Sequence, residues 1–331
     1  MKTTQHQREG QPAASEPAPT LCNLCGADDA VEIIPSTLDE VEKGAWSAYA
    51  CTSSGYGRHG PIVRCRHCGL VYLTPRPDHD DVLEIYSAVK DPLYVAERAG
   101  RVLTFEHHLK PMERFTGPAL RTEGEETQRR RLLDVGAYTG VFVEIAAQHG
   151  WDAWGVEPSE WAVAEAQQQG LQMVRGTLEE ALGAGTFAPS GFSVITMWDV
   201  IEHVDDPLGT LQAAWRALEP GGYLVVHTMD LDSLFARLMG KRWPWFMEMH
   251  LFYFTRGTLR SMLEAAGFTV SWMGAQGRYL QAGYLASRVT ALFPRMGRLV
   301  ERLVEATRLD GRPLRINLGD LFTTYARKPA E

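Results

Sequence analysis

The chain of 331 residues lacks the features of an integral membrane protein and of a general nucleic-acid binder. No run approaches the ~18 uncharged apolar residues that a helix needs to cross a bilayer. Positive charge is scarce, because 33 Lys and Arg stand against 41 Asp and Glu, for a net charge of −8. An acidic chain repels the phosphates of a nucleic acid. We therefore expect no integral membrane segment and no nucleic acid as a partner.

The first twenty residues lack the apolar core of a signal peptide. They are polar and rich in Pro, Ala and Gln, so residues 1–20 are predicted to form a disordered tail. A chain without a leader is expected in the cytoplasm, where thiols stay reduced. Cysteine is scarce as well, at five residues, but four of the five form two pairs.

Both cysteine pairs have the pattern Cys-x-x-Cys-Gly, and the paired residues are Cys22, Cys25, Cys65 and Cys68. Two residues between thiolates let both sulfurs reach one ion at about 2.3 Å, and two such knuckles complete a tetrahedron. We predict a structural zinc ion with a filled shell, and hence no catalytic role for it. Two disulfides or a redox dithiol are the alternative. Cys51 belongs to neither pair and is expected to be a buried apolar residue.

Patterns of strand, glycine and helix alternate from Arg131 onward. This alternation predicts parallel strands joined by right-handed crossovers, and hence an α/β fold with a doubly wound, mostly parallel sheet. The expected strands are Leu132–Val135, Trp151–Val156, Leu171–Val174, Phe192–Trp198 and Tyr223–His227, with later ones at Phe268–Met273 and Phe322–Ala326.

The remaining segments suggest a domain plan. A zinc ribbon is predicted at 21–76, a helical cap with a polar linker at 77–125, and the α/β domain at 126–331. The polar linker is expected at Arg121 to Arg131. Tyr284–Val304 predicts a basic amphipathic helix, broken or kinked by Pro294, that packs on the domain or on a second subunit of a homodimer. Contact with an acidic membrane surface is the alternative.

The first expected strand leads into a glycine turn that begins at Asp134 and ends at Gly140. Gly136 and Gly140 let a ligand approach the backbone closely. Tyr138 takes the middle glycine's place in G-x-G-x-x-G, and Asp134 suits an ammonium group better than a phosphate. Glu157 ends the second strand, where a carboxylate can accept hydrogen bonds from both ribose hydroxyls. The pattern favours a cationic adenosine-type ligand over NAD, and an ordinary strand-turn-helix with a surface Glu is the alternative.

This region resembles class I S-adenosylmethionine (SAM)-dependent methyltransferases. The matching blocks are LLDVGAYTG, WGVEPS, SVITMWDVIEHVDDP, LEPGGYLVV and HLFYF…L…AAGF. More narrowly, the chain resembles bacterial methyltransferases with a CxxCG…CxxCGLVY zinc ribbon, which are often found with sugar or secondary-metabolite pathways. The resemblance spans about residues 21–275. It implies the Rossmann-like methyltransferase fold, SAM as cofactor and a small-molecule acceptor.

The resemblance also implies a cofactor site at the ends of the strands. The glycine turn should line the methionine end of SAM, Glu157 should hold the ribose, and the loop after the third strand should flank the adenine. The family's acidic residue after the third strand is absent here. The residues implied to bind the cofactor are Asp134, Gly136, Tyr138, Gly140, Glu157, Pro158, Thr177, Leu178, Trp198 and Asp199.

His203 is the candidate general base. It follows the fourth strand, where the acceptor should enter, and its ordinary pKa of about 6.5 suits proton removal at neutral pH. Asp230, at the end of the fifth strand, is expected to orient it, and His250 is a second catalytic candidate. Alternatively, Glu202 and His203 cap the next helix or bond the backbone.

Three aromatic features complete the candidate site. The segment from Trp243 to Phe254 is expected either to lie over the site and exclude water or to form a packed core edge. Family likeness suggests that Tyr86 and Tyr94 close the other side. His227 is expected to be a core histidine.

Together these features predict an enzyme that transfers a methyl group from SAM to a hydroxyl of a sugar or secondary metabolite. Transfer to carbon or nitrogen of a similar metabolite is one alternative. A catalytically inactive zinc-ribbon interaction protein is another, because Tyr138 departs from the family's glycine.

Overall fold

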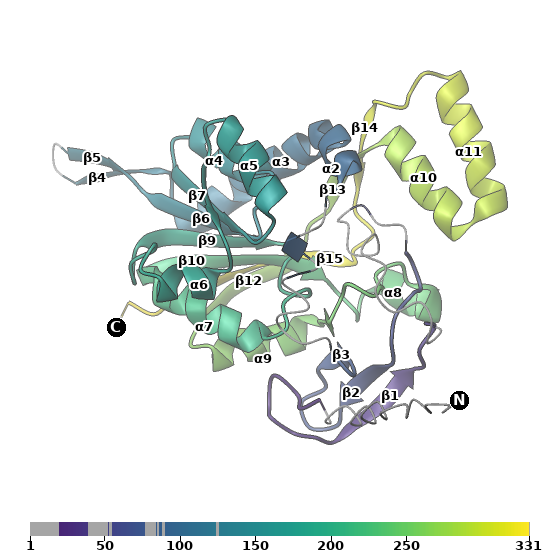
Figure 1. The fold of residues 1–331 in the computed structure, drawn as a ribbon, viewed down its shortest axis with the longest axis horizontal. Helices are drawn as coiled ribbons and strands as arrows, with labels where there is room; N and C mark the ends of the chain where they lie inside the picture. The colour runs from purple at the N-terminus through teal and green to yellow at the C-terminus, as the bar shows by residue number, and fades with distance from the viewer. Residues whose placement is uncertain are drawn as a thin grey trace, which may run out of the picture.

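The structure is a computed structural model that describes residues 20–38, 52, 55–76, 84, 86–87, 90–123 and 126–330. Cys51 and nearly all of the predicted tail lie outside the described residues. The centre of the fold is a seven-stranded sheet in the order β12-β15-β10-β9-β6-β7-β8 (Figure 1).

Five strands of this sheet run parallel. They are β6 (Arg131–Val135), β7 (Asp152–Glu157), β8 (Gln172–Arg175), β9 (Phe192–Trp198) and β10 (Leu218–Met229). β15 (Leu321–Arg327) is antiparallel to both of its neighbours, β10 and β12 (Thr269–Ala275). The prediction of a doubly wound, mostly parallel sheet is therefore confirmed. Strand order reverses between β6 and β9, and such switch points form the crevices where α/β sheets bind ligands.

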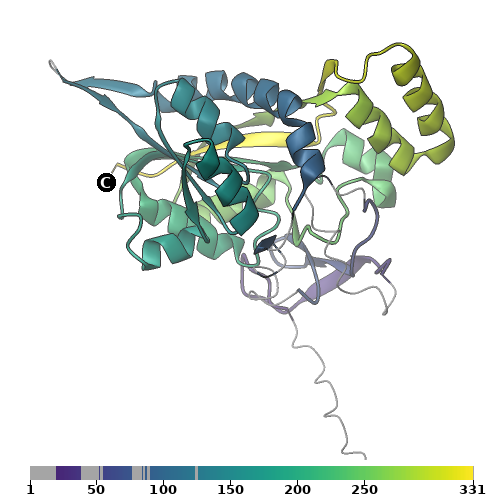
Figure 2. The same ribbon diagram turned by 45° about the horizontal axis from the view of Figure 1, so that its top comes forward.

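Helices cover both faces of the sheet, as Figures 1 and 2 show. Successive strand residues point to opposite faces, so Leu132 packs in one core and Leu133 in the other. One face carries α3 (Arg98–Thr116), α4 (Val141–Gln148) and α5 (Glu160–Gln168), with α2 (Pro92–Ala96) leading into α3. The other carries α6 (Leu178–Gly183), α7 (Pro207–Ala217) and α9 (Arg256–Ala265).

Capping residues set the helix starts beside the crevice. The Ser159 side chain accepts a hydrogen bond from the Ala162 amide at the start of α5, and Thr177 forms a capping box with Glu180 at the start of α6. Asp206 caps α7, whose first residue is Pro207. Glu202 and His203 therefore do not cap the next helix, but His203 does bond the backbone, because its Nδ1 lies 2.9 Å from the Met249 carbonyl.

The cysteine pairs lie in a small antiparallel sheet of β1 (Ala30–Ile34), β2 (Ile62–Cys65), β3 (Val71–Leu73) and β11 (Phe252–Tyr253). The fourth strand, β11, comes from the aromatic segment of the α/β domain. Phe252 and Phe254 are fully buried in a core that is continuous across both parts. The end of the aromatic segment, from Phe252 to Phe254, thus forms a packed core edge that fastens the cysteine-bearing sheet to the α/β domain.

The segment expected to be a polar surface linker contains two strands. The chain there pairs as a hairpin of β4 (Leu120–Glu123) and β5 (Glu126–Arg129). The described residues of β5 are all exposed, so neither strand needs the alternation of apolar residues that would have revealed it.

The stretch between β12 and β15 forms a C-terminal excursion at the right of Figure 1. It consists of β13 (Arg278–Gln281), α10 (Ala282–Leu292), α11 (Pro294–Ala306) and β14 (Pro313–Ile316). Pro294 is the first residue of α11, which confirms the predicted break. Nearby lie α8 (Leu234–Met239) and the 3-10 turn η3 (Gly240–Arg242). Among the described residues, no helix has the length and apolar character to cross a membrane.

Candidate active site

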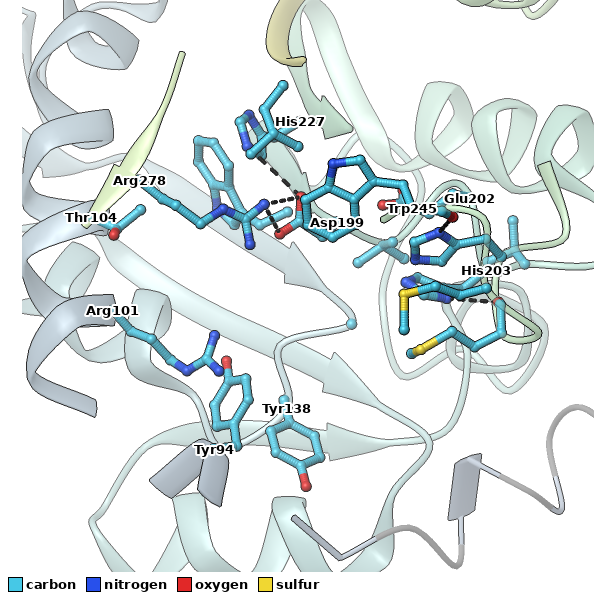
Figure 3. Close-up of a pocket in the computed structure, with 18 of the residues that line it drawn as sticks. Tyr94, Arg101, Thr104, Tyr138, Asp199, Glu202, His203, His227, Trp245 and Arg278 are labelled. Carbon is cyan, nitrogen blue, oxygen red and sulfur yellow. Dashed lines mark hydrogen bonds and ion pairs between the residues drawn. The ribbon is translucent and has the colours of Figure 1, made fainter. Parts of the chain in front are cut away.

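A cavity of about 940 Å³ lies at the carboxyl ends of β6, β7 and β9. Its wall brings together ten of the predicted site residues: Gly136, Tyr138, Glu157, Pro158, Thr177, Leu178, Trp198, Asp199, His203 and His250. Asp134, Gly140 and Asp230 are not part of that wall. Figure 3 shows the glycine turn on one side of the cavity and His203 on another.

The glycine turn after β6 is built for close contact. Gly136 has φ +67°, and a Cβ there would lie 2.6 Å from Val200 Cγ2, so no side chain fits. Gly140 also has positive φ, but a Cβ there would meet Leu171 Cδ1 at 2.6 Å. Gly136 therefore opens the cavity to a ligand, whereas Gly140 lets α4 pack closely against its neighbours.

Tyr138 holds the left-handed conformation of the missing glycine, with φ +46°. Its ring packs edge-on against Tyr94, with centroids 4.5 Å apart, and also contacts Trp161. Its hydroxyl accepts a hydrogen bond of 3.1 Å from the Asp91 amide. Figure 3 shows this ring pointing away from Asp199 and His203, so the side chain does not fill the cavity.

The Glu157 carboxylate ties the end of β7 to this turn. Oε2 accepts a hydrogen bond of 3.0 Å from the Tyr138 amide, and Oε1 accepts one of 2.9 Å from the Ser159 amide. Burial raises the pKa of Glu157 to about 7, although both amides favour the charged form. The carboxylate is thus fixed beside Gly136 and faces the cavity with its remaining lone pairs.

Asp134 lies in the sheet beneath the turn. Thr196 Oγ1 donates a hydrogen bond of 2.6 Å to its carboxylate. Burial and the nearby Glu157 carboxylate together raise the pKa of Asp134 to about 8, although the Thr196 hydrogen bond favours the charged form. Asp134 therefore lies beneath the turn and not in the wall of the cavity.

Asp199 is the centre of a charged network on the opposite wall. Arg278 Nη2 donates to both of its carboxylate oxygens, at 3.0 and 3.2 Å, and His227 Nε2 lies 3.7 Å away. Burial raises the pKa of Asp199, but Arg278 and His227 outweigh burial and hold it below its ordinary value. Sequence reasoning missed Arg278, which reaches the site from β13 and carries no motif.

His227 is buried, as expected of a core histidine. Its Nδ1 lies 2.9 Å from Thr323 Oγ1, and burial lowers its pKa to about 4. It also lines the cavity, which sequence reasoning did not foresee.

His203 is held in one orientation. Its Nδ1 lies 2.9 Å from the Met249 carbonyl and 2.9 Å from the Tyr86 hydroxyl. A carbonyl only accepts, so Nδ1 carries the proton of the neutral ring and Nε2 carries the lone pair. Burial lowers the pKa of His203, whereas the Met249 carbonyl and Asp199 raise it.

His250 stands beside His203, with ring centroids 4.7 Å apart. Its Nδ1 lies 2.7 Å from the Trp245 carbonyl, and burial lowers its pKa to about 3. Glu202 is buried nearby and accepts a hydrogen bond of 2.9 Å from Thr228. These three residues offer potential ligand atoms within 4.8 Å of one another, close enough to share a divalent ion.

Asp230 does not orient His203. Its carboxylate instead accepts a hydrogen bond of 2.9 Å from Arg256 Nε, at the start of α9, and one of 3.1 Å from the Asp232 amide. The chain turns away from the cavity after β10, and for that reason the strand-end argument failed here.

The four paired cysteines form a second cluster, apart from the cavity. The Sγ atoms of Cys22 and Cys68 lie 3.4 Å apart, and those of Cys25 and Cys65 lie 3.6 Å apart. A disulfide would need about 2.05 Å, so these sulfurs are not bonded to one another. All four sulfurs lie within 4.8 Å of one another, as ligands of one tetrahedral ion do.

Known proteins share much of this chain. Residues 105–271, just over half of it, match the family model described as a methyltransferase domain. A ubiquinone biosynthesis O-methyltransferase of Pectobacterium atrosepticum is 28% identical over 171 residues, covering 48% of this chain and 65% of the relative. Another, from Cereibacter sphaeroides, is 37% identical over 123 residues, covering 35% of this chain and 49% of the relative. The chain thus spans less than two thirds of these curated relatives.

Solved structures also align with it. A SAM-dependent methyltransferase from Archaeoglobus fulgidus is 17% identical, with a TM-score of 0.47, and the alignment covers 72% of this chain and all of that one (100%).

The buried Asp134 predicts a pH dependence of stability. Its folded pKa of about 8 lies above its unfolded pKa of about 3.9, so the folded state holds an extra proton between these values. The free energy of unfolding should therefore fall as pH rises from 5 to 8, by up to about 1.4 kcal/mol per pH unit from this group. Asp134→Asn should flatten that slope, since its amide oxygen still accepts from Thr196.

Urea denaturation at several pH values measures this slope. Asp232→Asn, at an exposed carboxylate, is the control and should leave it unchanged. An Asp134→Asn protein whose slope equals that of the wild type would contradict the assignment.

Proposed function

This chain belongs to the methyltransferase-domain family, and on that premise we propose that it transfers the methyl group of SAM to a hydroxyl of a small-molecule acceptor, a sugar or secondary metabolite. One observation carries the proposal: a single cavity holds both the glycine turn with Glu157 and the oriented His203. The matched relatives named as O-methyltransferases support oxygen as the methylated atom.

The cavity suits SAM at its glycine end. Gly136 leaves room for the ligand's backbone contact, and Glu157 can accept hydrogen bonds from the ribose hydroxyls. Thr177 and Leu178 stand where the adenine would lie. Arg101 lies on the cavity wall and supplies a cation for the amino-acid carboxylate of SAM. Its guanidinium lies 3.4 Å from the Tyr94 ring centroid. Its buried Nε has no hydrogen-bond partner among the described residues.

SAM brings a methyl group already activated on a sulfonium, so the chain's own residues must position and deprotonate the acceptor. His203 Nε2 is the proton acceptor, because Nδ1 is occupied by the Met249 carbonyl and the Tyr86 hydroxyl. With SAM bound, Nε2 would take the proton of the acceptor hydroxyl, whose oxygen would receive the methyl group released from the sulfonium. The negative charge of Asp199 stabilises the imidazolium that results. His250, whose pKa is about 3, remains neutral and orients the acceptor by a hydrogen bond.

Two rival functions give different expectations. Transfer to carbon or nitrogen would use the same cavity, with His203 removing a proton from an acidic C–H or N–H group. An inactive interaction protein would be favoured if Tyr138 blocked the cofactor end. The packing of its ring between Tyr94 and Trp161 argues against that alternative.

We also propose that Cys22, Cys25, Cys65 and Cys68 hold one structural zinc ion. Gly26 and Gly69 follow the two pairs with φ +73° and +77°, the left-handed turn that a zinc knuckle requires. With four sulfurs around it, the ion would fasten β1–β3 and take no part in methyl transfer.

Replacement of His203 tests the proposed base. His203→Ala should lower kcat by about 10²- to 10⁴-fold, the usual contribution of a general base, and leave the Kd of S-adenosylhomocysteine unchanged. The assay follows label from methyl-tritiated SAM into a panel of deoxysugar nucleotides and catechols, using the best acceptor. His149→Ala, far from the cavity, is the matched control. Metal content is compared across the proteins, because His203 stands beside Glu202 and His250. Equal turnover in His203→Ala would remove it as the base.

Replacement of a paired cysteine tests the zinc proposal. The purified protein should carry about one zinc per chain by elemental mass spectrometry, and Cys65→Ser should lose most of it and melt at a lower temperature. Cys51→Ser, outside both pairs, should keep the metal. A wild-type protein that stays folded and takes up no zinc would contradict the proposal.

A further inference from the structure

One part of the cavity is apolar and belongs to neither the cofactor end nor the catalytic histidines. Its wall comes from α8, α10, β14 and the loop after β14. These labelled elements lie at the right of Figure 1, whereas β7 lies at the left. The residues are Phe235, Leu285, Val289, Leu292, Ile316 and Leu318, which we call the apolar arm.

One face of α10 supplies three residues of the apolar arm. Leu285, Val289 and Leu292 recur at the spacing of one helical face, and all three are half-buried along the cavity. A helix that presents three aliphatic side chains to an internal space normally packs against a core. Here the face borders a cavity, so an apolar group of a ligand is the partner that would remove it from water.

The arm is continuous with the place of methyl transfer. Trp245, Met247 and Met249 cluster with Tyr56 and Tyr86 beside the two histidines. On α10, Arg288 donates a hydrogen bond of 2.8 Å to the Thr52 carbonyl and also interacts with Tyr56 of this cluster. A molecule whose hydroxyl meets His203 therefore has a polar end beside the histidines and aliphatic walls beyond them.

The arm also opens to the surface through an apolar mouth. Phe293 and Leu318 line the cavity, yet 41% and 52% of their surfaces are exposed. Leu234 and Leu238 of α8 are more than 70% exposed nearby, at 73% and 76%. An apolar entrance to an apolar channel admits an aliphatic chain more readily than a charged one.

We propose that the acceptor is an amphiphile: its hydroxyl-bearing head lies at His203, and its aliphatic chain occupies the apolar arm. This inference rests on the proposed methyl transfer and adds the class of substrate.

Binding of n-alkyl glucosides tests the inference. Methyl, butyl, hexyl and octyl β-D-glucosides are titrated below their micelle-forming concentrations into protein saturated with S-adenosylhomocysteine. Each methylene that enters the arm loses its contact with water, so affinity should rise by about tenfold for every two methylenes added. An affinity that does not change with chain length, or no binding at any length, overturns the proposal.

Variants show whether the gain in affinity with chain length arises in the apolar arm. Val289→Glu should abolish the dependence on chain length, because an aliphatic chain would meet a carboxylate, and should leave S-adenosylhomocysteine binding intact. Val289→Thr, which keeps the size of the side chain but adds a hydroxyl, should reduce the gain in affinity. Leu303→Glu, on the exposed face of α11 and outside the cavity wall, is the matched control and should keep the full gain. A full gain in Val289→Glu overturns the proposal.

The outcomes separate this inference from the proposed function. A steep dependence on chain length in a protein that binds no S-adenosylhomocysteine would support the apolar arm and refute the methyltransferase function. A flat series in a protein that methylates short acceptors would refute the arm alone.

Discussion

The contact between the Glu157 carboxylate and the Tyr138 and Ser159 amides determines the shape of the cofactor end. It joins the end of β7 to the turn after β6, beside the point between β6 and β9 where strand order reverses. Without that carboxylate, two buried amides would lose their acceptor, and a buried donor without a partner costs about 1–3 kcal/mol. The same contact holds Tyr138 in a left-handed conformation that a tyrosine seldom adopts. The turn keeps its shape without the middle glycine because its amide is held from one side and its ring from the other.

The acceptor end depends on a second junction. The Glu202 carbonyl accepts hydrogen bonds from the Leu251 and Phe252 amides, at 2.8 and 3.1 Å. This junction brings the 243–250 loop over His203, and Phe252 continues into β11 of the cysteine-bearing sheet. The small sheet therefore supports the loop that carries Trp245, Met249 and His250. A metal that stiffens that sheet would reach the chemistry only through this mechanical connection, consistent with a closed four-sulfur site.

Local sequence patterns predicted most of the fold and part of the candidate site. Strands with continuous apolar runs, such as Phe192–Trp198, were found with their observed bounds, because burial on both faces leaves no polar interruption. Gly136 and Glu157 were found because a turn and a strand end have fixed positions in a parallel sheet. The β4–β5 hairpin was missed because it is exposed and polar. Arg278 and the apolar arm were missed because they enter the cavity from segments that only tertiary packing brings near. Asp230 was misassigned because its partner, Arg256, is set by the start of α9.

Binding of S-adenosylhomocysteine by isothermal titration calorimetry is the most direct test of the central claim, with wild-type, Glu157→Gln and Glu160→Gln proteins compared. Glutamine at 157 has one acceptor oxygen, but the Tyr138 and Ser159 amides need one each. The turn should therefore distort, and the ribose should lose its hydrogen-bond partner. The account predicts binding to the wild type, a Kd at least about tenfold weaker for Glu157→Gln, as the loss of about 1.4 kcal/mol implies, and no change for the exposed Glu160→Gln. No binding to a folded wild-type protein, or equal binding to Glu157→Gln, would contradict it.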